Sequence, residues 1–147
     1  MVSPELLRRY PYFTNISEES LKQIAMLAEE KKFPAGVQLF SEGDPADFLN
    51  VIVSGEVNIQ YLLGSGEKRT VDTLVDGDIL CWSALVEPYK TTAIGTTSKE
   101  THVVAIDAAK LRELCVKDPM VGYQLMLEIA KLLAHRLEGA RVQLAAS

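Results

Sequence analysis

Short segments that alternate polar and apolar residues, separated by glycine-containing turns, occupy the middle of this chain from Phe33 to Ile106. Alternation with a period of two places every second side chain on one face, which is the pattern of a half-buried β-strand. Strands are predicted over residues 37–40, 48–53, 56–62, 68–74, 90–97 and 102–106. Over the whole β region we expect seven or eight short strands, which at this spacing are typical of a double-sheet sandwich or jelly roll.

Two helices are predicted before this β region. Ser3 and Pro4 form a helix start, because a capping residue precedes a proline at the first helical position, and this helix ends by Tyr10. Ser17 starts a second helix with an apolar stripe, which ends near Lys31.

Two further helices are predicted after the β region. Asp107 caps a helix that runs through Cys115, and Pro119 opens a longer helix that runs to about Leu144. The long helix carries a continuous apolar stripe, which consists of Val121, Leu125, Ile129, Leu132, Leu133 and Leu137. This stripe either packs on the β region or pairs in part with a second copy of the chain, which would make a homodimer through the C-terminal helix.

The expected fold class is therefore mainly β with flanking helices, as a double-stranded β-helix (jelly-roll) barrel. The 147 residues suffice for one domain, divided into N-terminal helices (1–32), a β jelly roll (33–106), and a hinge with the long C-terminal helix (107–147). The longest apolar runs are only a few residues, so we expect no membrane span. The N-terminus lacks a basic start followed by an apolar stretch, and a cytoplasmic location is expected.

The charge of the chain argues against direct binding to nucleic acid. The formal net charge is −5, whereas phosphate contacts usually need a basic face. We also expect no recognition helix, because the predicted long helix runs to within a few residues of Ser147.

No group of residues resembles a catalytic or metal centre. His102 and His135 lie far apart in the sequence, and the two cysteines, Cys81 and Cys115, fit no metal spacing. No serine or cysteine sits in a nucleophile motif with a base, and no nucleotide-binding glycine fingerprint occurs. We therefore expect no enzyme activity, no catalytic residues, no metal and no cofactor.

The segment from Gly77 to Ala93 has the outline of a phosphate-binding cassette. A strand ends near Val75, a turn follows, and residues 82–86 read as one short helical turn that Pro88 ends. A strand followed by a short helix can present backbone N–H groups to an anion.

These segments together resemble the cyclic nucleotide-binding domain of the catabolite-activator (cAMP receptor protein) type. The resemblance covers almost the whole chain and rests on four motifs: Phe33-Pro34-Ala35-Gly36, Phe40-x-Glu42-Gly43-Asp44-x-Ala46-Asp47, Ile52-x-x-Gly55-x-Val57, and Ile106-Asp107 with Leu111, Leu114 and Asp118-Pro119. The resemblance implies a jelly roll that binds a cyclic nucleotide, cAMP or cGMP, without the DNA-binding domain that such regulators append.

The cassette departs from the family pattern at its two charged positions. The family's Gly-Glu, whose glutamate accepts from the ribose hydroxyl, aligns with Cys81-Trp82; the family's Arg-Ser-Ala, whose arginine pairs with the phosphate, aligns with Thr91-Thr92-Ala93. The candidate site residues that remain are Cys81, Trp82, Ser83, Ala84, Leu85, Thr91, Thr92 and Ala93. Since a hydrogen bond to a charged group contributes roughly 1.5–3 kcal/mol, losing both anchors weakens binding by about two to four decades.

Three further residues affect whether the predicted site can still bind a ligand. Lys90 either supplies a point charge to the cassette or is a surface lysine. In a strand Lys90 and Thr91 point to opposite faces, so only one of the two can reach the pocket. Arg136, on the long helix, either meets the ligand or pairs with Glu138 or an acid of a partner. Trp82 either lines a more apolar pocket or fills it, and filling is the simpler reading.

The function predicted from these features is that of a stand-alone regulatory or sensor domain. It would bind a small ligand, such as cAMP, weakly, and signal through movement of the C-terminal helix. The alternative is a pseudo-sensor that has lost nucleotide binding and acts as a dimerisation or docking module for a protein partner of unknown identity. A third possibility is a pocket for a different, less charged ligand.

Overall fold

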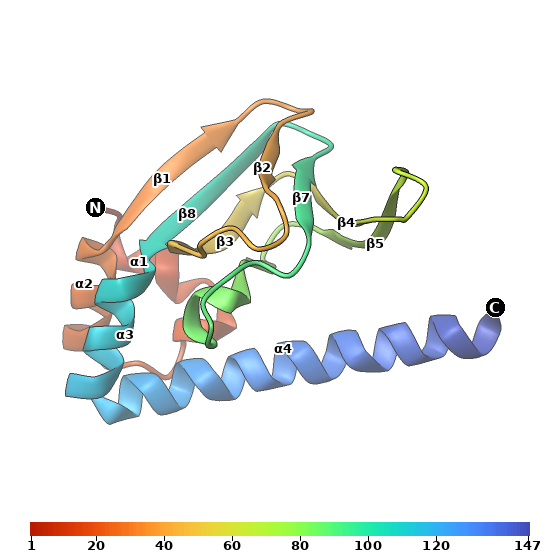
Figure 1. Cartoon of the computed structure of the whole chain (residues 1–147). Helices are drawn as coiled ribbons and strands as arrows, with labels where there is room; N and C mark the ends of the chain where they lie inside the picture. Colours follow the sequence, from red (N-terminus) through yellow and green to blue (C-terminus); the bar gives the residue numbers. More distant parts are fainter.

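The computed structural model describes residues 1–147 as two β-sheets with helices against one of them (Figure 1). The strands are β1 (Ala28–Phe33), β2 (Gln38–Phe40), β3 (Phe48–Ser54), β4 (Val57–Leu62), β5 (Lys68–Leu74), β6 (Ile79–Leu80), β7 (Ile94–Thr97) and β8 (Thr101–Asp107). The helices are α1 (Pro4–Arg8), α2 (Glu18–Met26), α3 (Ala108–Lys117) and α4 (Pro119–Ala146), with 3₁₀ turns η1 (Pro11–Phe13) and η2 (Trp82–Leu85).

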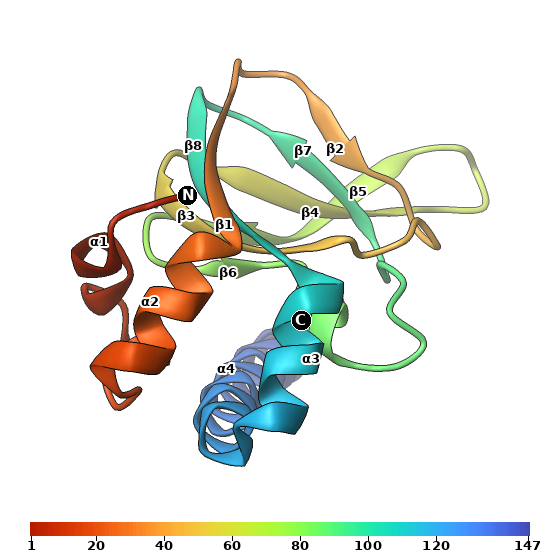
Figure 2. The ribbon, with the colours of Figure 1, turned by 90° about the vertical axis from the view of Figure 1, so that its left-hand side faces the viewer.

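Each sheet has four antiparallel strands. One has the order β1-β8-β3-β6 and the other β2-β7-β4-β5, so strands distant in sequence lie side by side (Figure 2). The predicted class, mainly β in jelly-roll order with helices at both ends, is confirmed.

The predicted helix starts are confirmed by their capping bonds. The Ser3 hydroxyl accepts from the amide of Glu5 at 3.2 Å, and the Ser17 hydroxyl accepts from the amide of Ser20 at the same distance. The Asp107 carboxylate accepts from the amide of Lys110 at 2.9 Å. These local bonds satisfy amides that have no partner within a helix.

Three predicted boundaries were wrong. Helix α2 ends at Met26 rather than near Lys31, and residues 28–33 form β1, which pairs with β8 along its whole length. The β region therefore begins at Ala28, because pairing with a distant strand overrides the local helical pattern. The strand predicted over 90–97 shortens to β7, with only an isolated bridge at Lys90, and the two-residue β6 was not predicted.

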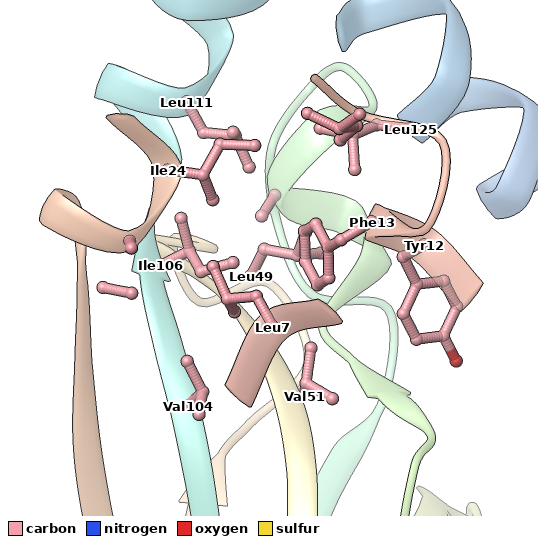
Figure 3. Close-up of a cluster of buried hydrophobic side chains, with 14 of the residues drawn as sticks. Leu7, Tyr12, Phe13, Ile24, Leu49, Val51, Val104, Ile106, Leu111 and Leu125 are labelled. Atoms are coloured by element: carbon pink, nitrogen blue, oxygen red, sulfur yellow. The ribbon is translucent and has the colours of Figure 1, made fainter. Parts of the chain in front are cut away.

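The main hydrophobic core lies between the helices and the β1-β8-β3-β6 sheet. It contains 22 buried residues, and Figure 3 shows Leu7, Phe13 and Leu125 meeting Leu49 and Ile106 there. In contrast, the hydrophobic cluster between the two sheets contains only five buried residues: Ile52, Val57, Leu74, Leu80 and Val103. The space between the sheets is thus the less filled part of the molecule.

Helix α4 has two halves with different surroundings. In its first half Val121, Leu125 and Ile129 are buried in the main core. In its second half Leu137 is 52% exposed, and the helix continues past the sheets to the C-terminus (Figure 1). The apolar stripe therefore packs on the domain in part, and pairing of the rest with a second copy stays a prediction. None of the helices combines the length and the apolar character that a membrane crossing needs.

Candidate functional site

A cavity of about 90 Å³ lies where strands of both sheets, η2 and α4 meet; we call it the cassette cavity. Its lining consists of Phe40, Ile59, Asp72, Leu74, Ile79, Cys81, Trp82, Ser83, Thr91, Thr92, Ala93 and Arg136. The structure thus brings together every predicted site residue except Ala84 and Leu85.

Cys81 adopts the left-handed backbone conformation immediately before η2, with φ 68° and ψ 52°. Glycine adopts this conformation without steric cost, whereas other residues are strained there. The family's glycine aligns at this position, so the backbone geometry supports the alignment of Cys81-Trp82 with Gly-Glu. Burial raises the pKa of the Cys81 thiol to about 12, which keeps it neutral.

The turn η2 directs its residues to two different places. Ser83 lines the cassette cavity, whereas Ala84 is fully buried in the main core and Leu85 packs against that core. The amide of Ala84 donates to the carbonyl of Cys81 at 3.0 Å. The Ala84 amide is therefore not available to an anion, because the turn uses that donor itself.

The cassette turn is tied to helix α3 by Arg112. The Arg112 guanidinium donates to the carbonyl of Ala84 at 2.6 Å and lies 3.9 Å from the ring centroid of Tyr89. Any movement of η2 would therefore change the contacts of α3, the helix that precedes α4.

Thr91, at the position of the family's arginine, has a buried hydroxyl that the protein already uses. It donates to the carbonyl of Ser41 at 2.5 Å and accepts from the amide of Asp44 at 3.1 Å. Thr91 thus holds the 41–44 turn rather than presenting a free hydroxyl. Thr92 is exposed and Ala93 is buried, and both line the cavity.

Arg136 points inward from α4 and reaches the cavity wall. Its guanidinium forms an ion pair with Asp72 on β5, and its second terminal nitrogen lies 3.9 Å from the carboxylate of Asp78. The alternative of pairing with Glu138 is not what the structure shows, because Arg136 faces Asp72 and Asp78. Arg136 is the only cation that lines the cavity, and two acids compensate it.

The structure also places Lys90 and Trp82 relative to the cassette cavity. Lys90 is exposed and does not line the cassette cavity. Trp82 is half-buried: it lines the cavity and also packs against the main core. The indole therefore narrows the site.

Asp72 is the site residue that sequence reasoning missed. It precedes buried Leu74 by two positions on β5, so both side chains lie on the same face of the strand. An acid on the inward face of an alternating strand was a signal that could have revealed it. Its partner on α4 could not be read from the sequence.

Comparison with known proteins agrees with this architecture. Residues 30–118 match the model of the cyclic nucleotide-binding domain family. A structure from Geobacter metallireducens, provisionally named a cyclic nucleotide-binding protein, is 37% identical, covers 93% of this chain and 99% of its own, and has a TM-score of 0.84. The regulatory domain of Toxoplasma gondii PKA, solved with cAMP, is 26% identical with a TM-score of 0.67, over 76% of this chain and 42% of its own.

A full-length regulator also matches. The CRP-like cAMP-activated global transcriptional regulator of Mycobacterium tuberculosis is 27% identical over 129 residues, which is 88% of this chain. This chain spans only 58% of the length of that regulator. On the match of the family model and the shared fold, the chain belongs to the cyclic nucleotide-binding domain family.

Proposed function

We propose that this domain is a regulatory sensor. Its helix α4 would respond, through Arg136, to an anionic ligand bound in the cassette cavity. The observation that carries this proposal is that Arg136 of α4 lines the same cavity as the cassette residues. A regulatory rather than a catalytic role also fits the relatives, which are regulators or regulatory domains.

The proposed signal is an exchange of partners at Arg136. In the structure the Arg136 guanidinium is paired with Asp72. A phosphate entering the cavity would meet Arg136 as the only lining cation and Asp72 as a like charge. The ligand would therefore compete with Asp72 for the guanidinium, and α4 would move with it. A ligand shifts the helix only by its difference in affinity for the two positions.

The ligand class that the family supports is a cyclic nucleotide, cAMP or cGMP, bound weakly. Ligand pockets usually have volumes of roughly 300–1,000 Å³, so the 90 Å³ of the cassette cavity must expand before a nucleotide enters. Trp82 and Thr91 replace the two usual charged contacts. We expect a dissociation constant on the order of 1 mM, from the loss of two charge-assisted anchors.

Calorimetric titration with cAMP and with cGMP, each to several millimolar, tests this function. The expected result is weak saturable binding that disappears in Arg136→Gln, because that variant removes the cation of the cavity. Binding that is unchanged in Arg136→Gln would refute the exchange. The absence of heat and of any melting shift would remove both nucleotides as ligands.

A second candidate function is that of a pseudo-sensor that acts as a docking or dimerisation module. The observation that favours it is that Thr91 and Arg136 are already satisfied within the protein. The exposed second half of α4 would be the contact surface, with apolar residues at Leu137, Val142 and Leu144. Light scattering of the wild type and of Leu137→Glu tests it, since a helix-mediated dimer would dissociate in the variant.

A further inference from the structure

A second, larger cavity of about 320 Å³ opens between the sheets beside β1 and β2; we call it the β1–β2 cavity. We propose that the β1–β2 cavity binds a small, uncharged, mainly aromatic molecule. This goes beyond the proposed function, because the site is separate from the surface that Trp82, Asp72 and Arg136 form.

The cavity exists because the two sheets are incompletely packed against each other. The buried hydrophobic cluster between the sheets has five residues, against 22 in the cluster between the helices and the sheet. Three aromatic rings face this space, those of Phe33, Phe40 and Phe48. A volume of 320 Å³ lies at the lower end of the roughly 300–1,000 Å³ that small-molecule sites occupy. Aromatic walls favour an aromatic guest through offset or edge-to-face contacts.

The charges around the cavity disfavour an anionic guest. Lys31 lies with its Nζ 3.7 Å from the ring centroid of Phe48 and 3.6 Å from the carboxylate of Glu29, so its charge is compensated. Asp47 adds an exposed carboxylate to the lining. An anion would gain no unpaired cation here and would meet Asp47. Asn50 and the neutral thiol of Cys81 are the polar groups that can contact a hydroxyl or amine of the guest.

The two cavities share part of their walls. Phe40, Cys81 and Thr91 line both of them. Cys81 begins the cassette turn, and Thr91 holds the 41–44 turn through its hydroxyl. A guest in the β1–β2 cavity would therefore contact residues that also line the cassette cavity.

Fluorescence titration with 1-aminoanthracene, an uncharged aromatic probe, tests the proposal. The expected result is a saturable blue-shifted enhancement with one site per chain and a dissociation constant on the order of 10–100 µM, typical of a compact apolar guest. Anthracene-1-carboxylate, of similar size but charged, should bind at least about tenfold more weakly, since it has no free cation to meet.

Cavity-filling variants locate the probe. Leu39→Trp and Val37→Trp place an indole in the β1–β2 cavity and should each weaken the probe at least about tenfold, because the guest loses its space. Two variants are used so that one remains if the other fails to fold. Val71→Trp, at an exposed position on β5, is the matched control and should bind as the wild type does.

The outcomes separate this proposal from that of the cassette cavity. Thr92→Trp fills the cassette cavity and should leave at least half of the probe affinity. If Thr92→Trp abolishes the signal while Leu39→Trp and Val37→Trp keep it, the probe occupies the cassette cavity and the proposal is wrong. The absence of saturable enhancement, or equal affinity for the carboxylate, would also overturn it. Neither result depends on whether cAMP binds.

Discussion

The guanidinium of Arg136 on α4 is paired with the carboxylate of Asp72 on β5, a residue 64 positions earlier in the chain. This pair joins the second half of the long helix to the wall of the cassette cavity. The only cation that lines the cavity is therefore neutralised by an acid of the same chain. The pair thereby holds the second half of α4 beside β5.

Breaking this pair should loosen the helix more than it destabilises the domain. Asp72→Asn should lower the free energy of unfolding by only about 0.5–1 kcal/mol, because both groups are partly exposed to solvent. Amide exchange over residues 132–146 should quicken, as measured by hydrogen–deuterium exchange. Glu128→Gln is the control, since it removes the Lys131–Glu128 pair, which lies within α4. Equal effects of the two variants would exclude a specific role for Asp72.

Restoring the family's charged residues should restore affinity. Trp82→Glu with Thr91→Arg should strengthen cAMP binding by about two to four decades, because both charge-assisted anchors return. The same double variant should lose about 1–3 kcal/mol of stability, since Thr91 no longer bonds Ser41 and Asp44. Calorimetry and urea unfolding measure the two effects. A folded double variant that ignores cAMP would show that the cassette alignment is wrong or that the cavity stays blocked.

The left-handed conformation of Cys81 predicts an unusual order of tolerated substitutions. Cys81→Gly should change the free energy of unfolding by less than about 1 kcal/mol, because relief of backbone strain offsets the lost packing of the thiol. Cys81→Val should cost more than about 2 kcal/mol, since a β-branched residue is poorly accommodated there. Chemical unfolding of both variants makes the comparison. A valine variant as stable as the glycine variant would contradict the backbone geometry.

The buried thiol also predicts how stability depends on alkaline pH. Burial raises the pKa of Cys81 from 9.0 to about 12, so the thiol ionises first in the unfolded chain. Its contribution to stability is complete below pH 9 and is lost progressively as the pH rises towards 12. The loss is at most about 1.4 kcal/mol per pH unit for one proton.

Urea unfolding between pH 8 and 10 measures this dependence, and Cys81→Ala should flatten it in part. Cys115, whose pKa burial also raises, accounts for a further share of the slope. Tyr12, whose pKa burial raises from 10.0 to about 12, begins to contribute only above pH 10. A slope that Cys81→Ala leaves unchanged would mean that this thiol is not protected by burial.

The close approach of the Phe40 ring to Gly95 predicts that a larger residue at position 95 destabilises the domain. A Cβ at Gly95 would lie 2.4 Å from Cζ of the Phe40 ring, so Gly95→Ala must displace the ring. The expected cost is about 1–2 kcal/mol, and adding Phe40→Leu should recover part of it. Gly64→Ala, where a Cβ meets nothing within 4 Å, should change stability by less than about 0.5 kcal/mol. Thermal unfolding checks all three; no recovery in the double variant would mean that Phe40 is not the obstacle.

Much of the fold could be predicted because its signals are local. The hairpin that joins β4 and β5, the caps at Ser3, Ser17 and Asp107, and the alternation in β3 depend on neighbours within a few residues. Strand β1 could not be recognised in this way. Its residues continue a helical pattern, and only pairing with β8, whose partner residues lie 68 to 78 positions later, makes them a strand.

The candidate site likewise has features that local sequence reveals and features that depend on distant residues. The loss of both charged family residues was visible from Trp82 and Thr91 alone. That the Thr91 hydroxyl already holds the 41–44 turn was not visible, because its partners lie 47 and 50 positions away.

By itself, then, the order of residues determined a jelly roll with a cassette that lacks its charged anchors, since periodicity, capping and turn residues act over short distances. Only the tertiary structure decided which cation faces the cavity and which acid neutralises it. Arg136 and Asp72 meet because packing against α3 and η1 sets the direction of α4. A contact of that kind depends on the packing of the whole domain rather than on any pattern near either residue.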